Sequence, residues 1–199
     1  ENWWRKTSGS PLNEIYRAYK AITNGTPINY TEALDSRDSN NWKAAMDTEI
    51  NALKANQTYK IIKQSPEDKV IKSKWVFKKK LNPDGSVARF KARLVAKGFL
   101  QKYGKDFHDT FAPVAKSKSI RLLLAIAGAR GHKVFHDDAT SAFLNGILKE
   151  LVILEPPEGY QEQYEDSNIS STEFRWLLLK ALYGLKQAPR EWNEVLHNF

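Results

Sequence analysis

The feature that most constrains this 199-residue sequence is a strand–turn–strand pattern between residues 74 and 97. Residues 74–80 predict a strand, and Asn-Pro-Asp-Gly at 82–85 predicts a turn, because proline and glycine supply the backbone angles that turns need. The return strand alternates between Arg89, Lys91 and Arg93 on one face and Phe90, Ala92 and Leu94 on the other. The segment therefore predicts a β-hairpin with an apolar face and cations on both arms.

Cations outnumber anions over the whole chain, with 31 Lys and Arg against 23 Asp and Glu and a formal net charge of +8. Such a surplus favours polyanionic partners, because Lys and Arg replace the counterions around phosphates. The basic hairpin has two open interpretations, a solvated surface or a grip on a phosphate chain or triphosphate. Cysteine is absent, which excludes disulfides, thiolate nucleophiles and Cys-ligated zinc and fits an intracellular protein.

Helices and strands are predicted in a mixed order, so the expected fold class is α+β. Trp42, Ala45, Met46, Ile50 and Leu53 have helical spacing, with Asn40 or Asn41 as the cap. Further helices are predicted at 12–22, at 120–129 with Ser117 or Ser119 as the cap, and from Pro189, where an apolar stripe is formed by Trp192, Val195, Leu196 and Phe199. Strands are predicted at 134–138, 151–154 and 174–179. The sequence also predicts a turn or extended link at 26–31, an extended stretch at 110–114 and a turn at 182–187. No apolar run is long enough to span a membrane.

Two carboxylates, Asp137 and Asp138, lie at the C-terminal end of the predicted buried strand at 134–138. Burying a carboxylate is costly unless it is paired or binds a metal, and Mg²⁺ prefers oxygen ligands. The pair either ends the strand at the surface or belongs to a metal site, such as that of two-metal nucleotidyl transfer or of an unrelated Mg²⁺-dependent hydrolase. One such cluster is too small to hold two ions.

Several short stretches, each weak alone, occur in a fixed order between residues 42 and 192. They are WKAAM at 42–46 with Glu49 and Ala52-Leu53, KWVFK at 74–78, FKARLVAKGF at 90–99, TFAPV at 110–114, AFLNG at 142–146 and ALYGLKQAPR at 181–190. Together they resemble the reverse transcriptase of Copia-type LTR retrotransposons. The resemblance implies RNA-directed DNA polymerase activity with two Mg²⁺ ions, on the fold of a right-hand polymerase with a mixed or antiparallel sheet packed with helices.

The same resemblance divides the chain into a leader or linker at 1–40, fingers at 41–130 with the basic hairpin 74–97, and a partial palm at 131–199. It implies an N-terminal fragment that ends before the second catalytic Asp motif, and we expect such a fragment to be inactive alone. The implied partners are RNA and DNA template–primer, dNTP and the rest of the Pol polyprotein (rest of palm, thumb, RNase H), with no membrane. The implied location is a cytoplasmic virus-like particle with nuclear access. The alternative is a non-catalytic nucleic-acid-binding remnant of a retroelement.

The resemblance also implies roles for residues near the active site. Asp138 matches the first catalytic Asp and metal ligand, with the carbonyl of Ala139 beside it and Asp137 as a neighbour. Phe143 matches the aromatic steric gate under the incoming sugar. Tyr183 and Gly184 match the loop that lines the nucleotide, where Gly184 would permit close backbone approach.

The hairpin matches fingertips that clamp the triphosphate with one Arg and one Lys. Arg93 is the first candidate for the Arg, with Lys91 second. Lys79 is the first candidate for the Lys, with Lys78 and Lys80 as competitors that alternation alone does not eliminate. The residues expected to contact the nucleic acid are Lys78, Lys80, Arg89, Lys97, Lys186 and Gln187.

Overall fold

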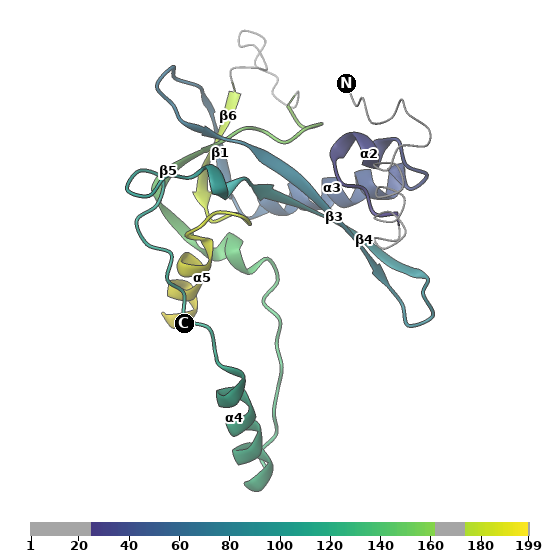
Figure 1. Ribbon diagram of the computed structural model, residues 1–199, viewed down its shortest axis with the longest axis vertical. Helices are drawn as coiled ribbons and strands as arrows, with labels where there is room; N and C mark the ends of the chain where they lie inside the picture. The colour runs from purple at the N-terminus through teal and green to yellow at the C-terminus, as the bar shows by residue number, and fades with distance from the viewer. Residues whose placement is uncertain (1–24, 162–173, 199) are drawn as a thin grey trace, which may run out of the picture.

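A computed structural model describes residues 25–161 and 174–198 of the chain. Its elements are α2 (Tyr30–Leu34), α3 (Ser39–Ala55), β1 (Tyr59–Lys63), β2 (Val70–Ile71), β3 (Ser73–Leu81), β4 (Val87–Ala96), η2 (Gly98–Leu100), α4 (Ser117–Ala129), η3 (Ala142–Asn145), β5 (Ile147–Leu154), β6 (Phe174–Lys180) and α5 (Ala188–His197). Helices and strands are mixed along the chain, as predicted (Figure 1). The prediction of a mixed α and β fold is therefore confirmed.

The predicted hairpin is present as the antiparallel pair β3–β4, in which Trp75 faces Leu94 and Phe77 faces Ala92. Its turn closes with the Gly85 N–H donating to the Asn82 carbonyl at 3.0 Å. The long helix α3 packs on the apolar face, as its helical spacing predicted. The buried Trp42 ring contacts Phe77 edge-on, with centroids 5.2 Å apart, so helix and hairpin share one core.

A second sheet of four strands has the order β1-β6-β5-β2. Strand β2 runs parallel to β5, and the other pairs are antiparallel, so the sheet is mixed. The predicted strands at 151–154 and 174–179 are confirmed, although β5 begins earlier, at Ile147. The sequence patterns do not predict strands β1 and β2. Strand β2 has only two residues, too few for an alternating pattern to be visible in the sequence.

The start of the described chain corrects two expectations. The expected link at 26–31 runs into a short helix, α2, whose cap is Asn29, because the Asn29 side chain accepts a hydrogen bond from the Glu32 N–H at 2.8 Å. Helix α3 begins at Ser39 after Asp38, so Asn40 and Asn41 lie inside its first turn and do not cap it. The expected helix at 12–22 lies outside the described residues.

The strand predicted at 134–138 is wrong, because residues 132–139 have no regular secondary structure and are exposed. An extended segment becomes a strand only when a neighbour pairs with its backbone, and none of the strands in the described ranges pairs with it. The predicted apolar helix exists as α4, with Lys116 at its cap position in place of Ser117 or Ser119. Within the part of the chain that the structure describes, α4 contributes no residue to the core.

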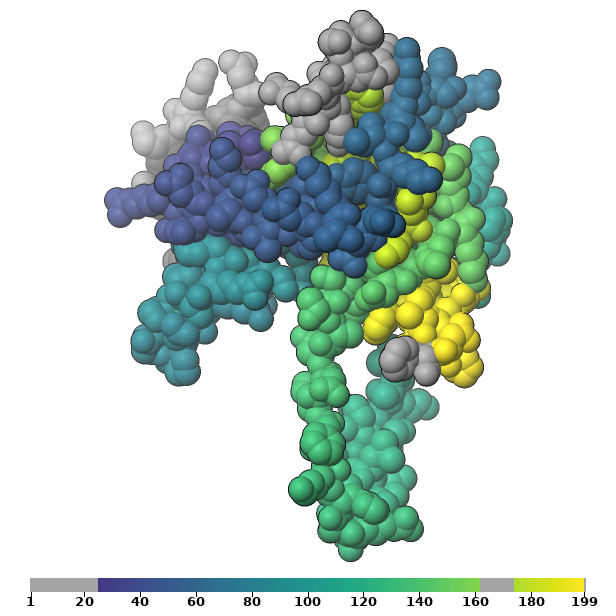
Figure 2. All heavy atoms as spheres, turned by 180° about the vertical axis from the view of Figure 1, so that it is seen from behind, coloured from purple at the N-terminus to yellow at the C-terminus, as the bar shows by residue number. Residues whose placement is uncertain are grey.

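Helix α4 and the segment after it project away from the two sheets (Figure 1). The space-filling view from behind shows the same projection clear of the body (Figure 2). The stripe predicted for the helix from Pro189 is only partly correct, because α5 buries Ala188 and Glu191 whereas Leu196 is exposed. Phe199 lies outside the described residues. Among residues 25–161 and 174–198, no helix combines the length and apolarity needed to cross a membrane.

Candidate functional site

One face of the β3–β4 hairpin carries a row of cations from both strands. Lys78 lies directly opposite Lys91 across the two strands. The neighbouring pair on this face is Lys80 opposite Arg89. Arg93 continues the row opposite Val76. Burial lowers the pKa of Lys91, and the neighbouring Arg93, Lys80 and Arg89 lower it further, against the opposite influence of Glu49. Like charges opposite each other destabilise a sheet, so this cationic face favours a polyanionic ligand.

Lys79 points to the other side of the hairpin. Its side chain is 13% exposed, and its Nζ lies 2.6 Å from Asp38 Oδ2 and 5.4 Å from the centre of the Phe90 ring. The structure therefore places Lys79 on the opposite face of the hairpin from Arg93. Lys78 and Lys80 lie on the same face as Arg93.

The turn at residues 182–187 packs against the end of β4. The Ala96 N–H donates to the Tyr183 carbonyl at 2.8 Å. Gly184 has a φ of +90°, and a Cβ at this position would lie 2.2 Å from the Ala96 carbonyl oxygen. A Cβ on Gly98 would lie 1.9 Å from the Gly184 oxygen, so both glycines are needed for this close backbone approach.

Three side chains from separate parts of the sequence meet beside this turn. The Arg93 guanidinium lies 4.8 Å from the centre of the Tyr183 ring. The Tyr183 ring in turn meets Phe143 edge-on, with centroids 4.9 Å apart and an interplanar angle of 69°. Arg93 comes from β4, Phe143 from η3 and Tyr183 from the turn, so tertiary structure brings together residues that lie far apart in the sequence.

The carboxylates of Asp137 and Asp138 lie in the exposed segment at 132–139, together with Ala139. Among residues 25–161 and 174–198, no group of three or more His, Cys, Asp or Glu side chains is placed to hold a metal ion. Asp138 and Ala139 offer the oxygen ligands that Mg²⁺ prefers. One carboxylate and one carbonyl nevertheless do not complete a two-ion site.

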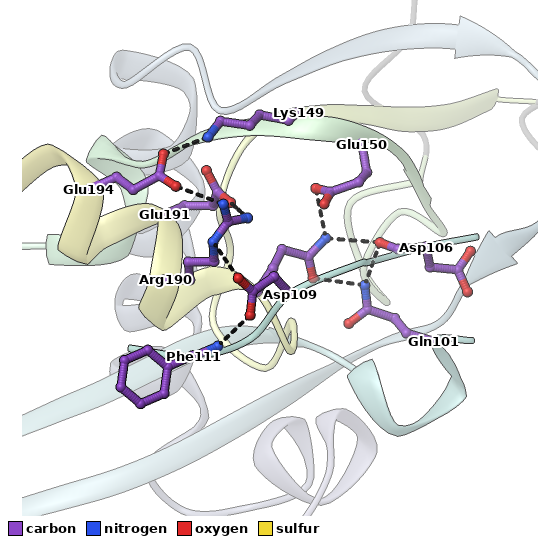
Figure 3. Close-up of polar contacts among 10 residues, drawn as sticks. Gln101, Asp106, Asp109, Phe111, Lys149, Glu150, Arg190, Glu191 and Glu194 are labelled. Atoms are coloured by element: carbon purple, nitrogen blue, oxygen red, sulfur yellow. Dashed lines mark hydrogen bonds and ion pairs between the residues drawn. The ribbon is translucent and has the colours of Figure 1, made fainter. Parts of the chain in front are cut away.

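A polar network joins the end of this turn to residues 101–106, and its members Gln101 and Asp106 are labelled in Figure 3. Gln187 is fully buried, and its Oε1 accepts a hydrogen bond from Gln101 Nε2 at 3.0 Å. Gln187 Nε2 donates to the Asp106 carbonyl at 3.0 Å. Sequence reasoning misses Gln101 and Asp106, because isolated polar residues in an irregular stretch carry no pattern. The neighbouring Lys186 side chain is exposed, with its Nζ 4.8 Å from the centre of the Phe107 ring.

A second polar cluster, centred on Arg190, ties α5 to its surroundings (Figure 3). Arg190 Nη2 lies 2.9 Å from Glu194 Oε1, and Arg190 Nε lies 3.4 Å from Asp109 Oδ2. Glu194 Oε2 also lies 2.5 Å from Lys149 Nζ on β5. The carboxyl of Glu191 is buried beside this cluster, and burial raises its pKa. The cluster holds α5 against β5 and against the loop that leads to α4.

Residues 56–199 match the family model described as reverse transcriptase (RNA-dependent DNA polymerase). The chain belongs to the reverse transcriptase family. It is 40% identical over 168 residues to the retrovirus-related Pol polyprotein from transposon RE1 of Arabidopsis thaliana, a stretch covering 84% of this chain and 11% of the relative. It is also 40% identical over 173 residues to the Pol polyprotein from transposon TNT 1-94 of Nicotiana tabacum, covering 87% and 13% respectively. No solved structure matches it.

These relatives confirm the resemblance to Copia-type elements, and the chain spans about a tenth of their length. The matched reverse transcriptase region runs from β1 to α5, so it contains the Arg93–Tyr183–Phe143 cluster and Asp138. Helix α3 lies before residue 56 and packs on this reverse transcriptase region through Trp42. Family membership leaves no support for an unrelated hydrolase built on Asp137 and Asp138.

Proposed function

We propose that this reverse transcriptase region holds the incoming nucleotide and the template–primer during RNA-directed DNA synthesis. The observation that carries the proposal is the contact of Arg93 with Tyr183 and of Tyr183 with Phe143, at one end of the cationic face. A nucleotide has a polyphosphate, which needs cations, and a sugar and base, which need flat apolar surfaces. The hairpin offers cations for the polyphosphate next to the Tyr183 and Phe143 rings, which offer flat apolar surfaces for the sugar and base.

The triphosphate is assigned to the cationic face of the hairpin. Arg93 is suited to it because a guanidinium can bind two phosphate oxygens at once. The partner lysine is assigned to Lys78 or Lys80, because they share the face of Arg93, whereas Lys79 would first have to leave Asp38. Lys91 and Arg89 extend the same face and are assigned to phosphates of the nucleotide or of the template–primer.

The sugar and base are assigned to the two rings next to Arg93. Phe143 is half-buried, and its ring packs edge-on against the Tyr183 ring beside Arg93. This supports its role as a steric gate that rejects a 2′-hydroxyl by shape. Gly184 lets the turn approach β4 closely enough to place the Tyr183 ring under Arg93.

Asp138 and the carbonyl of Ala139 are assigned to Mg²⁺ on the family resemblance, and further carboxylates would be required to complete the site. In two-metal polymerases the ions activate the attacking hydroxyl and stabilise the leaving group. We therefore propose that the 199-residue chain does not extend a primer on its own. Primer extension by the isolated chain that disappears in Asp138→Asn would contradict this.

The test of nucleotide holding is a calorimetric titration of the chain with dTTP in the presence of an RNA–DNA template–primer. Arg93→Ala should weaken dTTP binding by about tenfold, because a hydrogen bond to a charged group is lost. The control is Lys43→Ala, which removes an exposed cation from α3 and should leave the affinity within about twofold. Equal affinities for Arg93→Ala and wild type would refute the proposal.

A second candidate is a nucleic-acid-binding protein without catalysis, and the row of cations on the β3–β4 hairpin favours it, because such a row binds phosphates of any kind. It predicts that the template–primer binds with a strong salt dependence, while dTTP does not bind at all. The same titrations therefore separate the two candidates. In either case we propose the rest of the Pol polyprotein as a partner, and a cytoplasmic particle with nuclear access as the location.

A further inference from the structure

The side chains of Gln101 and Gln187 form a pair of buried amides, and Gln187 is the last residue of the turn at 182–187. Gln101 Nε2 donates to Gln187 Oε1 at 3.0 Å, and the two residues are 4% and 0% exposed. The pair joins segments that are 86 positions apart in the sequence. Burial and separation together suggest a role in holding two parts of the site in register.

Both amides also hold backbone groups. Gln187 Nε2 donates to the Asp106 carbonyl at 3.0 Å, and Gln101 Oε1 accepts from the Lys186 N–H at 2.8 Å. An amide has a donor and an acceptor at the same end of the side chain, so each glutamine can bond its partner and a backbone group simultaneously. The result is a closed loop of hydrogen bonds between the turn and residues 101–106.

The segment that receives these bonds is itself anchored. The Asp106 carboxylate accepts the Lys102 N–H at 2.5 Å and forms an ion pair with Lys69. The anchor keeps the Asp106 carbonyl directed at Gln187, whose Nε2 also approaches Glu150 Oε2 at 3.4 Å. The polar atoms of Gln187 are thus all engaged inside the protein. Contact with nucleic acid would require breaking bonds in a place where unsatisfied groups are costly.

We propose that Gln101 and Gln187 are positioning residues for the nucleotide site. Their amide pair sets the turn at 182–187 against the segment after β4, and so holds the Tyr183 ring under the Arg93 guanidinium. This inference rests on the proposed function, because it assigns Tyr183 and Arg93 to the nucleotide. It replaces direct nucleic-acid contact as the role of Gln187.

The test compares Gln101→Leu, Gln187→Leu and the double variant with wild type. Each single variant should weaken dTTP binding by about tenfold, because either change breaks the pair and leaves buried polar groups unsatisfied. The double variant should be no weaker than the single variants, because the pair is already lost in each. Affinity for the RNA–DNA template–primer should change by less than about twofold, because the outer part of the cationic face is untouched.

Hydrogen exchange supplies a readout that does not depend on ligand binding. The Ala96 N–H, which donates to the Tyr183 carbonyl, should exchange about tenfold faster in the variants, whereas amides within the β3–β4 ladder keep their protection. The control is Gln161→Leu, which removes an exposed amide and should behave as wild type.

Two outcomes would overturn the inference. One is wild-type exchange at Ala96 together with wild-type dTTP affinity. The other is a general loss of amide protection with equal weakening of dTTP and template–primer, which would show a role in overall stability alone. If Arg93→Ala leaves dTTP binding unchanged, the proposed function has failed instead, and exchange at Ala96 still decides whether the pair holds the turn.

Discussion

Lys79 and Arg93 lie on opposite faces of the β3–β4 hairpin. Arg93 faces Val76 across the ladder and lies over Tyr183, whereas the Lys79 ammonium is bound to Asp38 on the side that packs on α3. Adjacent residues of a strand point to opposite faces, so Lys78 and Lys80 must lie on the side of Arg93. This relationship divides three consecutive lysines between the two faces of the hairpin.

Lys79→Ala should therefore affect stability and not nucleotide binding. Its ion pair is largely shielded from water on the lysine side, and its loss should lower the free energy of unfolding by about 1 kcal/mol. The matched variant is Lys78→Ala, which should weaken dTTP binding several-fold with little change in stability. Urea unfolding and dTTP titration of both variants provide the measurements, and the reverse pattern would show that Lys79 is the clamp.

Gly184→Ala should destabilise the chain by more than about 2 kcal/mol, because a left-handed backbone costs about 1–2 kcal/mol for a residue with a Cβ and steric overlap adds to it. The overlap is with the Ala96 carbonyl oxygen, only 2.2 Å from the added Cβ. Gly104→Ala separates the two effects, because Gly104 also has a positive φ, of +79°, but no atom within 4 Å of its added Cβ. Equal losses in urea unfolding would mean that close approach to β4 contributes nothing.

Glu49 should make stability depend on pH. Burial raises the pKa of its carboxyl above the ordinary value of 4.5, and the Leu94 N–H, Arg93 and Lys91 offset this only in part. The folded chain then binds more protons than the unfolded chain, so the contribution of Glu49 is fully present below pH 4.5 and is lost as pH rises through the raised value. Glu49→Gln keeps an acceptor for Leu94 and should be more stable than wild type at pH 7, with the difference disappearing in acid.

Glu194→Gln serves as the control, because it should change the pH dependence of the free energy of unfolding in the opposite direction. A hydrogen bond from Lys149 lowers the pKa of the Glu194 carboxyl, so its contribution is present at neutral pH and is lost as pH falls through the lowered value. Urea unfolding between pH 3 and pH 7 should thus show the two variants diverging from wild type in opposite directions at pH 7. Identical pH profiles for wild type and Glu49→Gln would contradict the assignment for Glu49.

The apolar surface of α4 should make the isolated chain self-associate. Leu122, Leu123 and Leu124 are 61%, 67% and 51% exposed. Contiguous exposed apolar groups promote association, so Leu123→Glu should reduce the apparent mass in light scattering at high concentration. Its unfolding free energy should change by less than about 0.5 kcal/mol, because Leu123 contributes little to the core. A large loss of stability would show that α4 is packed in solution.

The sequence by itself determined the elements whose pattern is local. Alternation in β4 and helical spacing in α3 depend on neighbours a few positions away, so the spacing alone places Leu94, Met46 and their partners on the core side. The ordered motifs also determined the family, because they need no knowledge of contacts. The strand expected at 134–138 failed for the complementary reason, since a strand requires a pairing partner that a local pattern does not reveal.

Only the tertiary structure decided how the site is divided among these residues. The register of β3 against β4 assigns Lys78 and Lys80 to the face of Arg93, and a shift of one position would reverse that assignment. The burial of Gln187 depends on Gln101, far away in the sequence, and so has no local signal. The reason is physical: propensity and periodicity describe one segment, whereas hydrogen bonds between segments and the burial they create exist only once the chain has folded.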